Sequence, residues 1–107
     1  MLALLYASQG NLVGATEQLR LWQALAPTDP GPHRALAQVL AQTGRLQEAL
    51  REQTTAVTLV PASASDWNDL GVLEIRAGNR DAARNDFSRA LALDPALEAA
   101  QNNIKKL

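Results

Sequence analysis

The residue whose type is best suited to chemistry is His33, the single histidine of the chain. A histidine can act as a general base or bind a metal ion near neutral pH. A metal site needs further histidine, cysteine or carboxylate ligands, and a base needs a nucleophile within reach. The chain has no cysteine and no close carboxylate cluster around His33. The sequence therefore predicts a half-buried residue on a helix face, and no catalytic residue, metal or cofactor.

Several carboxylates are followed by an arginine three residues later, as in Asp81 and Arg84, Asp86 and Arg89, and Glu48 and Arg51. Opposite charges at this spacing meet on one face of a helix and stabilise it by roughly 0.2–0.5 kcal/mol per pair. We interpret them as surface pairs rather than as acid–base dyads. The glycines occur singly, so no glycine-rich loop is present to hold a phosphate group. We therefore expect no enzyme.

The elements that position these residues follow from an internal repeat of 34 residues. Four columns are identical in three copies, namely Pro27, Pro61 and Pro95; Gly10, Gly44 and Gly78; Ala15, Ala49 and Ala83; Leu25, Leu59 and Leu93. Each glycine is placed to end one helix in a left-handed conformation, and each proline to stop the next helix. The small alanine lets the two helices approach closely. The repeat therefore predicts helix pairs.

We expect first helices at about 1–9, 31–43 and 66–77, second helices at about 12–26, 46–60 and 80–93, and a last helix at about 96–106. Asp29 and Asp94 each precede a proline, which predicts two helix N-caps. Two apolar columns on the first helices should form the core: Leu2, Leu36, Leu70 and Ile104; Leu5, Val39, Leu73 and Leu107.

The third copy resembles the tetratricopeptide repeat, through Trp67, Leu70, Gly71, Ala83, Phe87, Ala90 and Pro95. Glu74 stands where that family has a tyrosine. The second copy has His33 in place of the tryptophan and Gln53 in place of an aromatic residue. The resemblance implies an all-α, right-handed superhelical solenoid of antiparallel helix pairs. We expect a single domain over 1–107, with repeats at about 1–29, 30–63 and 64–97 and a capping helix at 96–107.

In this family the first helices line a concave face that usually holds a peptide or a partner helix. The resemblance therefore implies a non-catalytic adaptor that binds a protein or peptide. The groove residues expected from the helical positions are Arg34, Gln38, Gln42, Asn68, Asp69, Val72, Ile75, Arg76 and Asn102. Arginine and amide side chains suit a peptide because each offers several hydrogen-bond donors.

Chaperone-binding members of the family clamp the carboxylates of a partner's tail with lysine, arginine and asparagine. Here Asp69 and Ala99 stand at two of those positions. Because Asp69 would repel a carboxylate, we expect no such clamp.

The alternative is a homo-oligomer that assembles through its N-terminal end. The first copy lacks the opening turn of its first helix, and Trp22 occupies a column where the family has a small residue. Trp22 then either fills the space of the missing turn or anchors an interface together with Leu4 and Leu5.

The charge and the hydropathy of the chain limit which classes of partner and which cellular locations we expect. The formal net charge is −1, which argues against nucleic acid. The apolar start lacks the basic region of a signal peptide, and no apolar run is long enough to cross a membrane. We therefore expect a cytoplasmic protein, with a periplasmic or envelope-associated location as the alternative if the sequence is a fragment. Abundant arginine, alanine and leucine favour a GC-rich bacterial source.

Overall fold

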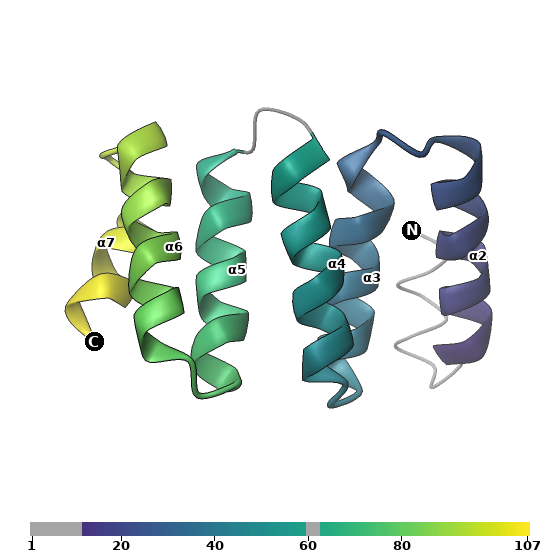
Figure 1. Cartoon of the computed structure of the whole chain (residues 1–107), viewed down its shortest axis with the longest axis horizontal. Coiled ribbons are helices and arrows are strands. Elements are labelled where there is room, and N and C mark those ends of the chain that lie inside the picture. Colours follow the sequence, from purple (N-terminus) through teal and green to yellow (C-terminus); the bar gives the residue numbers. More distant parts are fainter. Residues whose placement is uncertain (1–11, 60–62) are drawn as a thin grey trace.

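The computed structural model describes residues 12–59 and 63–107, and its described part consists of a row of antiparallel helices (Figure 1). These are α2 (Leu12–Leu25), α3 (Pro30–Gln42), α4 (Leu46–Leu59), α5 (Ala64–Arg76), α6 (Arg80–Leu93) and α7 (Glu98–Lys105). Each helix packs against the next along the chain, and α5 also touches α7. The fold is an all-α solenoid, as the repeat predicts. The first expected helix, at about 1–9, lies outside the described residues.

The turns inside the helix pairs follow from glycine. Gly44 and Gly78 have φ values of 80° and 86°, the left-handed region that other residues adopt only at a cost. At the first turn, the Arg45 N–H donates to the Leu40 carbonyl at 2.8 Å and the Gly44 N–H donates to the Ala41 carbonyl at 3.1 Å. These two bonds satisfy the last carbonyls of α3 and let the chain reverse into α4.

One predicted N-cap is confirmed and the other is wrong. The Asp29 carboxylate accepts a 2.8 Å hydrogen bond from the Gly31 N–H, with Pro30 at the first position of α3. Asp94 instead closes α6, since its N–H donates to the Ala90 carbonyl. Its side chain then accepts from the Ala96 N–H at 3.1 Å, inside a turn that ends at Leu97. Because that turn uses residues 94–97, α7 begins at Glu98 rather than at 96.

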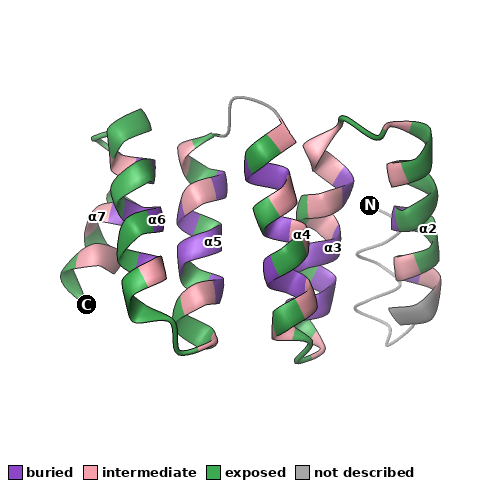
Figure 2. Ribbon diagram, viewed as in Figure 1, coloured by how far each residue is buried: buried purple, intermediate pink, exposed green. Residues whose placement is uncertain are grey.

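The core lies where neighbouring helices face each other (Figure 2). Leu36, Val39, Leu70 and Leu73 of the predicted columns are buried. Ile104 and Leu107 are only partly buried, because α7 is the last helix of the row. Leu2 and Leu5 lie outside the described residues.

The packing of α5 on α6 depends on a glycine. A Cβ atom on Gly71 would lie 2.5 Å from the ring of Phe87, which is fully buried. Such a distance is well inside van der Waals contact, so the missing side chain is what allows this approach. Trp67 is partly buried against the same core.

Candidate functional site

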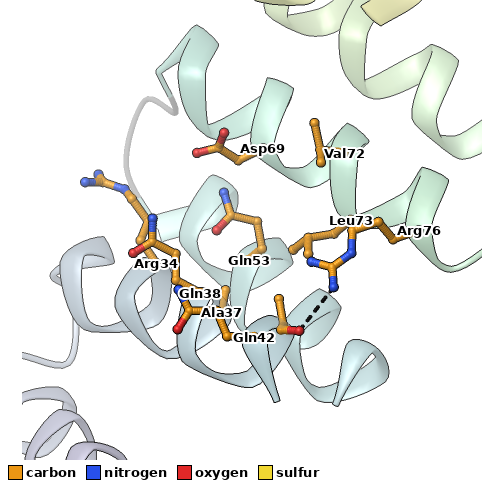
Figure 3. A pocket seen from close by; sticks show the side chains of 10 residues that line it. Arg34, Ala37, Gln38, Gln42, Gln53, Asp69, Val72, Leu73 and Arg76 are labelled. Carbon is orange, nitrogen blue, oxygen red and sulfur yellow. Dashed lines mark hydrogen bonds between the residues drawn. The ribbon is translucent and has the colours of Figure 1, made fainter. Parts of the chain in front are cut away.

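A groove with a volume of about 620 Å³ lies between α3 and α5, with Gln53 of α4 in its wall (Figure 3). Its lining residues come from the first helices of two successive repeats: Arg34, Ala37, Gln38, Ala41 and Gln42 from α3, and Asp69, Val72, Leu73 and Arg76 from α5. The buried residues Ala37, Ala41 and Leu73 make the groove apolar at its base. Around them, exposed charged and amide side chains are available to a ligand.

One end of the groove is acidic. The Arg34 Nε atom lies 2.8 Å from Asp66 Oδ1, and the Asp66 side chain is only 4% exposed. Asp66 is fixed in the first turn of α5, where its N–H donates to the Ser63 hydroxyl and its carbonyl accepts from Gln53. Arg34 is therefore already paired with a buried carboxylate, and Asp69 adds a further negative charge beside the pair.

The protonation of Asp69 reflects these neighbours. Partial burial raises the pKa of the Asp69 carboxyl above its ordinary value of 3.8, and the nearby Asp66 charge raises it further, while Arg34 opposes both effects. A raised pKa means that the ionised carboxylate is poorly compensated at this place. This end of the groove would therefore be stabilised by a cation.

The other end of the groove is basic. Arg76, in the last turn of α5, donates from Nη2 to the Ala41 carbonyl at 3.2 Å. That carbonyl lies at the C-terminal end of α3, where the helix dipole favours a positive charge. Asp69 and Arg76 are seven positions apart on α5, which corresponds to about 10 Å along the helix axis. Figure 3 shows them toward opposite ends of the α5 wall of the groove.

The structure brings six of the nine predicted groove residues together in this lining. The prediction that Asn68 lines the groove is wrong. Asn68 is buried, and its Oδ1 accepts a 3.0 Å hydrogen bond from Asn103 of α7. It is one position from Asp69, and one helical step of about 100° turns it from the groove toward α7. Ile75 and Asn102 are exposed but do not line the groove.

Among the lining residues that were not predicted, Gln53 and Leu73 were missed for different reasons. Gln53 occupies a column where an aromatic residue is expected, and it is 3% exposed. A polar residue at a core position signals that a buried hydrogen-bond partner is needed, which here is the Asp66 carbonyl. Leu73 was expected only in the core, and it serves both the core and the base of the groove.

His33 lies in a separate polar cluster that joins α2, α3 and α4. Its Nδ1 is 2.7 Å from Glu52 Oε1, which also accepts a 2.8 Å hydrogen bond from Gln23. Arg20 approaches the second Glu52 oxygen at 3.4 Å. His33 is half-buried, as the sequence predicts, and its geometry is that of a contact between repeats. Within the described residues, no group of three or more potential metal ligands occurs.

Trp22 lies near the C-terminal end of α2, the first of the described helices, and is 43% exposed. Its ring packs over the start of α3, where a Cβ atom on Gly31 would lie 3.0 Å from it. It is therefore neither a buried core residue nor fully solvent-exposed. Leu4 and Leu5, the other predicted interface residues, lie outside the described residues. In the described part of the chain, no helix has the length and apolarity needed to cross a membrane.

Comparison with known proteins identifies the repeat. Residues 64–97 match the family model of the tetratricopeptide repeat. A curated relative, a UPF0162 protein of Xylella fastidiosa (strain 9a5c), is 34% identical over 76 residues, which cover 64% of this chain. The chain spans only 27% of that relative's length.

Solved structures share the fold over nearly the whole chain. MamA superposes with a TM-score of 0.84 at 21% identity, covering 96% of this chain and 60% of MamA. The first tetratricopeptide domain of Spaghetti (RPAP3), bound to an HSP90 peptide, superposes with a TM-score of 0.85 at 20% identity. The match covers 97% of this chain and 82% of the RPAP3 domain. YrrB, described as having an unusual peptide-binding site, superposes with a TM-score of 0.84 at 24% identity. The match covers 99% of this chain and 54% of YrrB. The sequence of residues 64–97 therefore matches the tetratricopeptide repeat, and the described helices have the fold of tetratricopeptide repeat proteins.

Proposed function

We propose that the groove between α3 and α5 binds an extended segment of another protein, so that the chain serves as a non-catalytic interaction scaffold. The observation that carries this proposal is the opposite charge at the two ends of one groove, with Asp69 beside the Arg34–Asp66 pair and Arg76 about two helical turns away. Between them, the exposed amides of Gln38 and Gln42 can both donate to and accept from a peptide backbone.

The spacing of the charges defines the ligand. An extended chain rises about 3.3 Å per residue, so the separation of about 10 Å along the α5 axis between positions 69 and 76 corresponds to roughly three residues. The segment should carry a basic side chain opposite Asp69 and a carboxylate opposite Arg76. The small base formed by Ala37 and Ala41 lets its backbone lie close to the helices.

The proposal also excludes one kind of peptide. The structural relative RPAP3 binds an HSP90 peptide that ends in Glu-Glu-Val-Asp. In this chain Asp69 lines the groove, and Arg34 is already engaged by Asp66. A tail of successive carboxylates would meet repulsion there, so we expect it to bind poorly.

Selection from a display library of randomised peptides tests the proposal. Each peptide has about twelve residues, so that an extended peptide is longer than the groove. Selected peptides should share a basic and an acidic residue about three positions apart. Titration into the ¹⁵N-labelled chain should shift the amides of Gln38, Val72 and Arg76. Selection without such a pattern, or shifts confined to other helices, would count against the groove.

Self-association is the second candidate, and it is favoured by the surface of α2. Leu21 and Leu25 lie one turn apart and are 64% and 84% exposed, beside the partly exposed Trp22. An apolar face of this kind is typical of an interface. Light scattering on a sizing column distinguishes the candidates, because a dimer would have twice the chain mass of 11.5 kDa. A monomer that still binds the selected peptides leaves only the groove.

A further inference from the structure

A second pocket, of about 380 Å³, lies between α4, α5 and α6 and shares no lining residue with the groove. Part of its wall is apolar, formed by Val57, Leu70 and the Trp67 ring. Two carboxylates, Glu74 and Asp86, line the same pocket. Glu74 stands where the family has a tyrosine, so the acidic character here is a feature of this chain rather than of the repeat.

Asp86 is the unusual residue of this pocket. It is only 8% exposed, and its Oδ2 atom has no hydrogen-bond partner among the residues that the structure describes. Burial raises the pKa of the Asp86 carboxyl to about 6, with Glu74 as the second cause and Arg89 opposing both. Buried carboxylates are normally paired, because losing water without a replacement is costly. An unpaired one lining a pocket therefore lacks a donor.

The two hydroxyl donors of the pocket and its guanidinium group are engaged elsewhere. The hydroxyl of Thr54 donates to the Leu50 carbonyl at 2.7 Å, and that of Thr58 donates to the Thr55 carbonyl at 2.8 Å. The Arg89 guanidinium, which the sequence predicts to pair with Asp86, lies over the Trp67 ring at 4.7 Å from its centroid. The carboxylates and the hydroxyl lone pairs of the pocket are hydrogen-bond acceptors, and Asn85 and Arg89 complete its polar lining.

We propose that this pocket binds a lysine side chain of a partner protein, with the ammonium group paired to Asp86 and Glu74. The methylene groups of a lysine would pack on Val57, Leu70 and Trp67 while its charged end reaches the carboxylates. A compact ammonium has three donors and no acceptor, which complements the acceptor oxygens of Asp86 and Glu74. A metal ion fits less well, because the described residues offer no group of three or more potential ligands here.

The test uses the blocked tripeptide acetyl-Gly-Lys-Gly-amide and its norleucine analogue, which keeps the methylene chain and lacks the ammonium. Titration into the ¹⁵N-labelled chain should shift the Trp67 indole and the amides of Glu74 and Asp86. The norleucine peptide should bind about ten-fold more weakly or worse, as expected when a charge-assisted hydrogen bond is lost. Affinity for the lysine peptide should also fall as the pH is lowered through about 6, because Asp86 becomes protonated.

Asp86→Asn should lose the binding, and Glu74→Gln should weaken it without altering the buried residue. Asp81→Asn is the matched control, since its side chain is fully exposed on the same helix. The proposal is overturned if the norleucine peptide binds equally well, if Asp86→Asn and Glu74→Gln both retain the affinity, or if the shifts map to Asp69 and the groove.

Discussion

Replacing Asp86 with asparagine should stabilise the fold at neutral pH and above. The folded pKa of Asp86 is about 6, against an ordinary value of 3.8. A carboxyl whose pKa is raised on folding binds its proton more tightly in the folded state, so stability decreases as the pH rises from about 4 to about 6. The ionised form therefore opposes folding, and removing the charge removes that cost.

The size of the effect follows from the two pKa values. At about 1.4 kcal/mol per pH unit, the difference corresponds to an upper limit of about 3 kcal/mol at pH values well above 6. Asp86 borders a pocket that is open to water, so we expect roughly half of this value. Near pH 4 the carboxyl is protonated in the folded state and about half ionised in the unfolded state, so most of the difference is absent and the two proteins should differ much less than at high pH.

Urea unfolding followed by circular dichroism at about pH 4 and about pH 8 measures the difference directly. Asp81→Asn, on the same helix and fully exposed, should show no comparable dependence on pH. The reasoning is refuted if Asp86→Asn destabilises the chain at the higher pH, or if its effect is the same at both.

Three further outcomes are expected. Gly71→Ala should destabilise the chain by about 1–3 kcal/mol in urea unfolding, because the added Cβ meets the Phe87 ring at 2.5 Å; an unchanged midpoint would contradict this packing. Glu52→Gln should weaken the contact with His33 and speed amide hydrogen exchange in α2 more than in α6; equal protection in both helices would show that the cluster does not hold α2. Affinity of the groove for a basic peptide should decrease as the pH falls toward the raised pKa of Asp69, measured by fluorescence anisotropy, and an affinity that increases would contradict the role of that carboxylate.

Much of the fold could be predicted because the requirements are local and repeated. Gly44 and Gly78 must adopt positive φ, and the 34-residue spacing places equivalent turns in each copy. Asp94 shows the limit of local reasoning, since the same carboxylate can cap a helix or close a turn. Here the Asp94 carboxylate accepts a hydrogen bond from the Ala96 N–H within a turn, and α7 therefore begins at Glu98.

The site could be predicted only in part, because it depends on side chains meeting across helices. Helical position placed Gln38 and Asp69 in the groove, but one step along α5 took Asn68 toward Asn103. The spacing of Asp86 and Arg89 indicated a surface pair, as Asp81 and Arg84 do form at 3.5 Å. Arg89 lies on Trp67 instead, because that ring, 22 positions earlier in the chain, is brought beside it by the fold.

The measurement that tests the central claim most directly is a charge exchange across the groove. Asp69→Arg combined with Arg76→Glu keeps the net charge and reverses the two ends, and Asp81→Arg with Arg84→Glu is the same exchange on exposed residues of α6. Fluorescence anisotropy should show that the groove exchange lowers the affinity for the selected peptide by about ten-fold or more. The exchanged protein should instead bind a peptide in which the basic and acidic residues are swapped. The control exchange should bind like the wild type. Equal affinity of the wild type and the groove exchange for both peptides would contradict the account.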